Sequence, residues 1–179
     1  MYPKGVWAAN CADLGCGTGL TGAAFRDSVK YMIGVDLSKE MIEKARLRGS
    51  YDKLISGNLE DLLVKQSRFP FNDVHSFDLI IAADVFVYIG DLRSIFTLVQ
   101  KRLTPSYGLF AFSTEKLDAT AAGSRPYVLQ SCARFAHKQS YIESLCEESS
   151  LRLINLECSI IRKNQGVDVS GYLVILGAL

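Results

Sequence analysis

The sequence has little proline, tryptophan or histidine, and almost no excess of charge of either sign. Four prolines, one tryptophan and two histidines occur among 179 residues, and 20 basic residues are balanced by 19 acidic ones. Without a net field, the chain has no overall attraction for nucleic acid or for an anionic membrane surface. No apolar run approaches the ~18 residues of a membrane span, and the first residues lack the apolar stretch of a signal peptide. We therefore expect no nucleic-acid partner, no membrane partner and a cytoplasmic location.

The cysteines do not have the pattern of a disulfide framework. There are five of them, an odd number at irregular spacing: Cys11, Cys16, Cys132, Cys146 and Cys158. Such usage is typical of free thiols in a reducing compartment. Cys11 and Cys16 have no further cysteine or histidine near them in the sequence, so no metal site is predicted.

The sequence does contain a glycine-rich turn, ADLGCGTG, at residues 12–19. Its three glycines occupy every second position, and glycine tolerates both positive φ and the close approach of a ligand. The apolar residues before the turn predict a strand that ends at Leu14, and the residues after it predict a helix. A turn between a strand and a helix N-terminus is typical of a nucleotide cradle.

These glycines fit two templates. Gly17, Gly19 and Gly22 form G-x-G-x-x-G, and Asp36 follows Gly17 by 19 residues, which is the dinucleotide fingerprint. Asp13, however, lies just before the turn, where a carboxylate would repel a pyrophosphate and attract an ammonium and a sulfonium. The residues therefore favour S-adenosylmethionine over a nicotinamide dinucleotide, and a nicotinamide oxidoreductase is the weaker alternative.

Three stretches together carry a resemblance to a known family. They are ADLGCGTG at 12–19, GVDLS at 34–38 with Met41 after it, and FDLII at 77–81. The chain resembles class I S-adenosylmethionine-dependent methyltransferases over nearly its whole length. Three further stretches, AADVFVYIGDL, ARFAHKQSY and IRKNQGVDVSGYLVIL, resemble small predicted methyltransferases to which TPR repeats are assigned.

The resemblance implies a Rossmann-like α/β fold with a doubly wound, seven-stranded, mostly parallel sheet. Its strand order would be 3-2-1-4-5-7-6, with the last strand antiparallel. The length fits a single domain, residues 1–179. Hydrophobic patterns agree and place strands at 31–35, 77–82 and 107–113, helices at 20–27, 39–48, 91–103 and 137–150, and a closing hairpin at 151–161 and 167–176.

Few residues precede the first predicted strand. In similar proteins, helices in this part cover the methionine end of the cofactor. We therefore expect another means of closure. Trp7 could serve as a lid, although packing near the first strand is the simpler role for it, and a second copy or a partner chain could also cover the site.

The resemblance also implies which residues hold the cofactor. Asp13 and the glycine turn would hold the methionine end, Asp36 the two ribose hydroxyls, and Asn58 with Leu59 the adenine. Asn58 stands where similar proteins have an acid, so its contact lacks the charge-assisted component. The alternative role of Asp36 is to cap the next helix, for which Ser38 is better placed. The predicted set is Asp13, Gly15, Cys16, Gly17, Thr18, Gly19, Asp36, Leu37, Met41, Asn58, Leu59 and Ala83.

Five residues are predicted to bound the acceptor pocket: Asp84, Tyr88, Arg134, His137 and Tyr141. Asp84 follows the fourth strand and could act as an acid or base, or merely cap a helix. His137 could be a general base, and Arg134 could hold a carboxylate or phosphate. Alternatively, His137 begins a helix and Arg134 pairs with a surface acid. Ala133 stands where the related pattern has glycine.

Taken together, these features predict methyl transfer from S-adenosylmethionine, with S-adenosylhomocysteine as product. In such a displacement the protein mainly supplies alignment and a dry pocket. A small molecule is the favoured acceptor, because no basic stripe indicates nucleic acid. The alternative is a catalytically silent protein that binds the cofactor or a partner.

Overall fold

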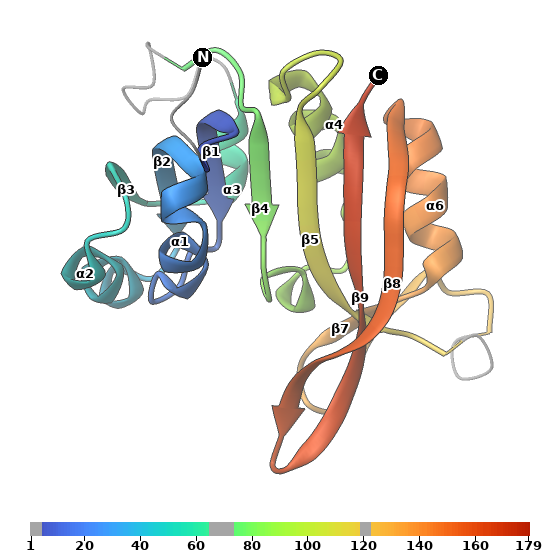
Figure 1. Cartoon of the computed structure of the whole chain (residues 1–179). Coiled ribbons are helices and arrows are strands. Elements are labelled where there is room, and N and C mark those ends of the chain that lie inside the picture. Colours follow the sequence, from blue (N-terminus) through green and yellow to red (C-terminus); the bar gives the residue numbers. More distant parts are fainter. Residues whose placement is uncertain (1–4, 65–73, 119–122) are drawn as a thin grey trace.

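The protein, described here by a computed structural model, forms one twisted sheet with helices on both faces (Figure 1). The structure describes residues 5–64, 74–118 and 123–179. The strands are β1 (Ala8–Leu14), β2 (Val29–Asp36), β3 (Lys53–Ser56), β4 (Leu79–Ala82), β5 (Leu109–Lys116), β6 (Tyr127–Leu129), β7 (Phe135–His137), β8 (Leu151–Asn164) and β9 (Val167–Ala178). The helices are α1 (Leu20–Phe25), α2 (Lys39–Arg48), α3 (Leu59–Leu63), α4 (Arg93–Arg102) and α6 (Gln139–Glu148), with short 3-10 turns η1 (Arg26–Ser28) and η2 (Phe86–Tyr88).

The strand order confirms the predicted fold. Strands β3, β2, β1, β4 and β5 are parallel neighbours in that order. Strand β9 pairs with β5 in antiparallel fashion, and β8 pairs with β9. These two long strands therefore take the predicted sixth and seventh places, and their hairpin runs on past the carboxyl end of β5 as a twisted ribbon (Figure 1).

Two short strands were not predicted. Strands β6 and β7 form a hairpin, and β7 pairs with Glu115 and Lys116, beyond the residues of β5 that pair with β4. Among the described residues the sheet therefore has nine strands rather than seven. His137 ends β7, so the helix predicted from residue 137 begins two residues later, at Gln139.

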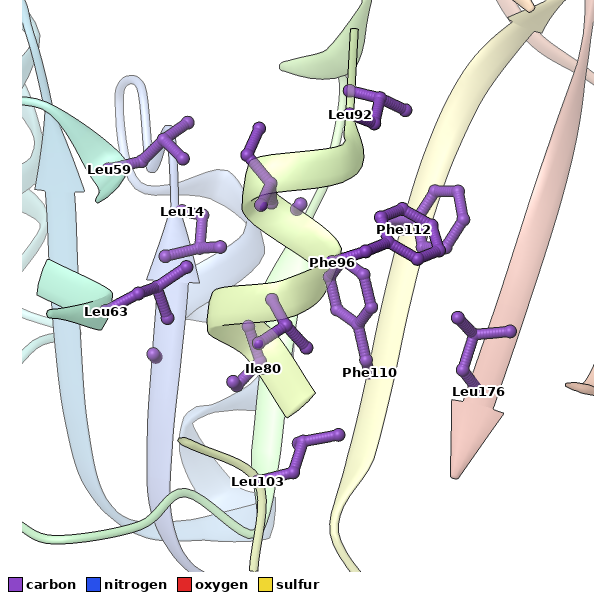
Figure 2. Packing of buried hydrophobic residues seen from close by; sticks show 14 of the residues in the cluster. Leu14, Leu59, Leu63, Ile80, Leu92, Phe96, Leu103, Phe110, Phe112 and Leu176 are labelled. Atoms are coloured by element: carbon purple, nitrogen blue, oxygen red, sulfur yellow. The ribbon is translucent and has the colours of Figure 1, made fainter. Parts of the chain in front are cut away.

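The sheet separates two apolar layers. The larger layer lies between the sheet and helices α3, α4 and α6, of which α4 contacts both α3 and α6. Its centre is a cluster of four aromatic rings, Phe86, Phe96, Phe110 and Phe112, with the last two ring centroids 4.9 Å apart (Figure 2). The smaller layer covers the other face around Met32 and contains Phe25 and Tyr51. Burial on both faces explains why β4 is apolar at every position.

The structure places all five cysteines as free thiols; Cys132 and Cys158 are exposed and the other three are buried. Within residues 5–64, 74–118 and 123–179, no helix combines the length and apolarity that crossing a membrane requires.

The loop of the β6–β7 hairpin places a non-glycine residue in a left-handed conformation. Ala133 has φ 59°. Its N–H donates to the Gln130 carbonyl at 2.9 Å, and the Gln130 N–H donates to the Arg134 carbonyl at 2.8 Å. An L side chain in this region costs roughly 1–2 kcal/mol, whereas glycine adopts it freely.

We expect Ala133→Gly to raise the free energy of unfolding by about 0.5–1 kcal/mol, because relief of the backbone strain exceeds the added flexibility of the unfolded chain. Urea unfolding measures the change. Ala111→Gly, in the extended strand β5, is the matched control and should lower the free energy of unfolding. A loss of stability on Ala133→Gly would contradict the conformation described here.

Candidate active site

A cavity of about 750 Å³ opens at the carboxyl ends of β1, β2 and β4. In an open parallel sheet this is where the strand order reverses and ligands bind. Ten of the twelve predicted cofactor residues line it: Gly15, Cys16, Gly17, Thr18, Asp36, Leu37, Met41, Asn58, Leu59 and Ala83. The predicted residues therefore gather in one place, although their individual contacts with a ligand stay predictions.

The glycine turn has the backbone that its composition predicts. Gly15, Gly17 and Gly19 all have positive φ, at 70°, 52° and 86°. A Cβ on Gly15 would lie 2.5 Å from Cγ2 of Val85, so no side chain fits there. A Cβ on Gly17 would meet no atom within 4 Å, so the backbone at Gly17 is open on its cavity side. The turn can therefore lie directly against a ligand.

Asp36 is held in place by the turn itself. Its Oδ2 accepts a hydrogen bond from the Gly17 N–H at 2.9 Å, and its Oδ1 accepts one from the Ser38 N–H at 2.8 Å. Each carboxylate oxygen keeps further acceptor capacity. Ser38, not Asp36, caps α2, since the Ser38 Oγ accepts from the Met41 N–H at 3.3 Å. The carboxylate is thus fixed at the cavity wall and able to accept two hydroxyl donors.

Asn58 has a second role that the sequence analysis did not predict. Its Oδ1 accepts from the Glu60 N–H at 3.0 Å and caps the short helix α3. Both Asn58 and Leu59 line the cavity. An amide carbonyl can accept more than one hydrogen bond, so the cap leaves the predicted adenine contact open to it.

Asp13 and Gly19, the two remaining predicted cofactor residues, do not line the cavity. Asp13 is fully buried behind the turn, where its Oδ2 accepts from the Tyr51 hydroxyl at 2.6 Å. Its Oδ1 has no hydrogen-bond partner in the described part of the chain, and burial raises the pKa of the carboxyl to about 7. Gly19 precedes α1 and packs against Ala45 and Tyr51. The prediction that Asp13 and Gly19 contact the cofactor directly is therefore corrected. Both residues lie on the side of the glycine turn that faces away from the cavity and support its conformation.

Tyr51 is a residue that the sequence analysis missed. Its hydroxyl donates to Asp13 and accepts from the Gly22 N–H at 3.0 Å. Its ring fills the space beside Gly22 and Gly34, where a Cβ would lie only 2.3 Å and 2.9 Å from ring atoms. Gly22 and Gly34 do not line the cavity. Glycine at these two positions is the feature of the sequence that could have indicated a large side chain packed against the backbone there.

We expect Tyr51→Phe to lower the free energy of unfolding by about 1–2 kcal/mol, because it removes the described partner of a buried carboxyl. It should also weaken binding of S-adenosylhomocysteine, since Asp13 and the first turn of α1 lose their common support. Urea unfolding and calorimetric titration measure the two effects. Tyr107→Phe, at a tyrosine that is 64% exposed, should change neither. Unchanged stability and binding for Tyr51→Phe would show that the Tyr51 hydroxyl does not hold Asp13 and α1 in place.

Three of the five predicted acceptor residues lie together. Asp84 and Tyr88 line the cavity, and Arg134 contacts both: its Nη1 is 3.6 Å from Asp84 Oδ1, and its guanidinium lies 5.2 Å from the Tyr88 ring centroid. Asp84 has φ 53°, and its N–H donates to Ser113 Oγ at 2.9 Å. Its side chain caps no helix, because Val85 precedes η2 and makes no side-chain cap.

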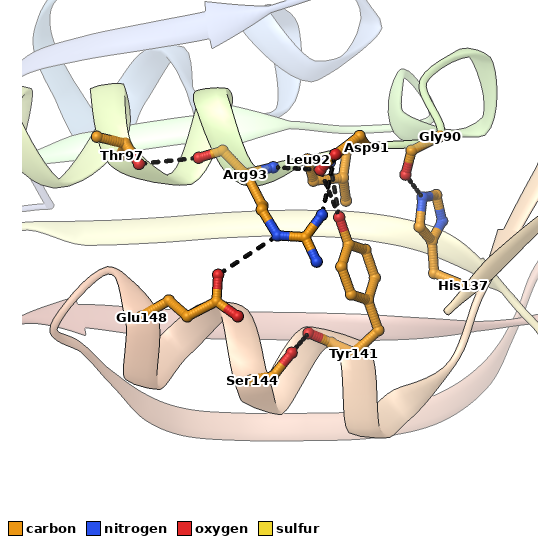
Figure 3. Close-up of polar contacts among 9 residues, drawn as sticks. All are labelled: Gly90, Asp91, Leu92, Arg93, Thr97, His137, Tyr141, Ser144 and Glu148. Atoms are coloured by element: carbon orange, nitrogen blue, oxygen red, sulfur yellow. Dashed lines mark hydrogen bonds and ion pairs between the residues drawn. The ribbon is translucent and has the colours of Figure 1, made fainter. Parts of the chain in front are cut away.

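The other two predicted acceptor residues are buried and form hydrogen bonds with the segment that follows Tyr88 (Figure 3). His137 is fully buried, donates from Nε2 to the Gly90 carbonyl at 3.0 Å and accepts at Nδ1 from the Thr114 hydroxyl at 2.6 Å. Tyr141 is also buried, and its hydroxyl donates to Asp91 and accepts from the Leu92 N–H. Neither lines the cavity, so their assignment to the acceptor pocket is wrong. Both instead fix the segment that follows Tyr88.

Burial lowers the pKa of His137. The unfolded histidine takes up a proton near pH 6.5 while the folded one stays neutral, so acidification favours the unfolded state. Asp13 acts in the opposite sense: its folded pKa of about 7 exceeds the unfolded value, so its stabilising effect is lost as the pH rises from about 4 to about 7.

We therefore expect the difference in unfolding free energy between the wild type and His137→Gln to shrink as the pH falls from about 7 to about 5. Taking the difference removes the contribution of Asp13, which both proteins share. Urea unfolding at several pH values measures it. A difference that grows on acidification would show that His137 binds a proton more tightly in the folded state than in the unfolded one, which would contradict its burial as a neutral imidazole.

Trp7 does not serve as a lid over this cavity. It lies beside the amino end of β1, with its backbone N–H donating to the Ser28 carbonyl at 3.0 Å, whereas the cavity is at the carboxyl end. Among the described residues, no group of three or more histidine, cysteine, aspartate or glutamate side chains could hold a metal ion.

The sequence pattern of the methyltransferase domain family matches residues 12–112, more than half of the chain. The protein therefore belongs to this family. Its cofactor is S-adenosylmethionine, as the sequence predicts. The narrower resemblance, to small methyltransferases with assigned TPR repeats, stays a prediction.

Solved structures share the fold over the whole chain. A methyltransferase from Methanosarcina mazei is 16% identical with a TM-score of 0.71, covering 100% of this chain and 98% of its own. One from Mesorhizobium loti is 21% identical with a TM-score of 0.67, covering 98% and 93%. The magnesium protoporphyrin IX methyltransferase ChlM from Synechocystis, solved with bound S-adenosylmethionine, is 11% identical with a TM-score of 0.67, covering 98% and 72%. No curated protein matches the sequence.

Proposed function

We propose that this protein transfers a methyl group from S-adenosylmethionine to a small-molecule acceptor. The observation that carries the proposal is the cavity of about 750 Å³, which has a nucleotide cradle at one end and an acid beside an aromatic ring at the other. Cavities of this size, apolar with a few convergent polar groups, are typical of small-molecule sites.

The residues present fit the cofactor. The open backbone at Gly17 offers close approach, and the fixed carboxylate of Asp36 offers two acceptor oxygens for the ribose hydroxyls. Asn58 and Leu59 lie where the adenine would be held. When bound, S-adenosylmethionine supplies an electrophilic methyl carbon on a sulfonium.

The other residues of the cavity align the acceptor and exclude water. Val85, Ile89 and Ile95 give the wall after β4 an apolar surface, and Asp84 with Tyr88 gives it a polar and aromatic part. Since methyl transfer is an in-line displacement, alignment in a dry pocket supplies much of the rate enhancement. This arrangement supports catalysis rather than cofactor binding alone.

The nature of the acceptor and the location of the protein are part of the proposal. The chain has a net charge of only +1, and the described residues that line the cavity include no lysine or arginine, which favours a small acceptor over nucleic acid.

Five free cysteines are in keeping with a cytoplasmic protein. Leu20, Leu37 and Tyr88 are 60% exposed or more beside the cavity, so a second chain that covers it stays a prediction.

Calorimetric titration tests the cofactor part of the proposal. We expect S-adenosylhomocysteine to bind and NADH not to bind. Asp36→Ala should weaken binding of S-adenosylhomocysteine at least about tenfold, because hydrogen bonds to a charged acceptor contribute roughly 1.5–3 kcal/mol each. Asp168→Ala, which removes an acid at the far β8–β9 turn, should leave binding unchanged.

Three outcomes would contradict the proposal in different ways. Binding of NADH instead would indicate an oxidoreductase, and equal binding by the Asp36→Ala variant would remove Asp36 from the site. Tight binding of S-adenosylhomocysteine without methyl transfer to any acceptor would indicate the catalytically silent alternative.

A further inference from the structure

The acceptor end of the cavity offers one accessible carboxylate. Of the described residues that line the cavity, Asp36, Glu60 and Asp84 are acidic and none is basic. Asp36 is engaged by the glycine turn, and Glu60 accepts from the Ser94 hydroxyl at 2.5 Å. The Asp84 side chain is 56% exposed and stands beside the cavity wall formed by Tyr88. The acceptor therefore meets a negative charge next to an aromatic face.

The two arginines near Asp84, Arg134 and Arg162, do not line the cavity. The Nη1 of Arg134 is buried without a hydrogen-bond partner, paired only at 3.6 Å with Asp84, while its guanidinium lies over the Tyr88 ring. Arg162 is ion-paired with the buried Glu115, which also accepts from Gln130 Nε2 at 2.6 Å. A carboxylate or phosphate on the acceptor would have to displace Asp84 from Arg134, or Glu115 from Arg162.

The available base also limits the acceptor. His137 is buried with both ring nitrogens hydrogen-bonded, which leaves Asp84 as the carboxylate that the described residues place at this end of the cavity to take a proton. A carboxylate accepts the proton of an ammonium far more readily than that of an aliphatic hydroxyl, because the proton affinities are better matched. An amine, once neutral, needs no further activation.

We propose that the acceptor is an amine whose ammonium group binds between the Asp84 carboxylate and the Tyr88 ring, in competition with Arg134. This inference rests on the proposed methyltransferase function and names its substrate class. An ammonium is attracted both by a carboxylate and by the face of an aromatic ring.

The reaction that follows is balanced. The bound ammonium gives one proton to an Asp84 oxygen and becomes a neutral amine. The nitrogen lone pair forms the new bond to the methyl carbon as the bond from that carbon to sulfur breaks, with its electron pair passing to sulfur. The products are a methylated ammonium, S-adenosylhomocysteine and one proton, which leaves Asp84 for solvent.

Isosteric probes test this inference by binding rather than by turnover. 3-Phenylpropylamine, 3-phenylpropan-1-ol and 3-phenylpropanoate share an aromatic body and differ in the terminal group. Each is titrated into the protein, both free and saturated with S-adenosylhomocysteine, and followed by NMR chemical shifts. We expect the amine to bind about fivefold or more tightly than the alcohol, as one partly exposed ion pair allows, and the carboxylate to bind most weakly.

Two variants separate the amine from an anionic acceptor. Asp84→Asn should abolish the preference for the amine and keep the fold, because asparagine tolerates the left-handed backbone at this position. Arg134→Gln should strengthen amine binding severalfold by removing the competing cation. Glu157→Gln removes one negative charge, as Asp84→Asn does, from an exposed residue of β8. It is the matched control for Asp84→Asn and should leave the binding of all three probes unchanged. The affinity for S-adenosylhomocysteine reports that each variant is folded.

The results that would overturn the inference are specific. If the carboxylate binds best and Arg134→Gln abolishes its binding, the acceptor is an anion held by Arg134. A preference for the amine over the alcohol that survives Asp84→Asn, or no amine binding by protein that still binds S-adenosylhomocysteine, also refutes the amine acceptor and leaves the methyltransferase proposal standing. Failure to bind S-adenosylhomocysteine would refute both.

Discussion

The turn between β1 and α1 is tied to the end of β2 by three hydrogen bonds, and the site depends on this junction. The N–H groups of Gly15 and Cys16 both donate to the Val35 carbonyl, and that of Gly17 donates to Asp36. The junction exists only because β1 and β2 are adjacent and in register, with Leu14 opposite Val35. The turn and the carboxylate are therefore positioned by the sheet and by each other, before any ligand binds.

Behind the junction, polar groups are buried in an arrangement that apolar packing alone would not produce. Asp13 is paired on one oxygen only, although burial of an unsatisfied polar atom is costly. Its carboxyl and the Tyr51 hydroxyl connect β1, α1 and the segment before β3. Such strain is commonly concentrated at functional sites, where the surrounding structure holds it in place.

The sequence predicted those parts of the structure that follow from local patterns. Three alternate glycines, an acid at the end of a buried strand and apolar runs of strand length are visible without tertiary information. The predicted strand order is therefore confirmed, and most of the predicted cofactor residues line one cavity. The β6–β7 hairpin was missed because its strands have only three residues each and no measurable period. The positions of His137 and Tyr51 depend on segments distant in sequence, so their partners could not be read from the chain.

The two ends of the cavity come from different parts of the chain. Residues 15–60 line one end and residues 83–95 line the other, where Arg134 of the β6–β7 loop pairs with Asp84. The two parts meet where Val85 fills the space that a side chain on Gly15 would need. Substitutions in residues 83–95 can therefore reshape one end of the cavity, while the pairing of β1 with β4 up to Asp13 and Ile81 keeps the glycine turn in place.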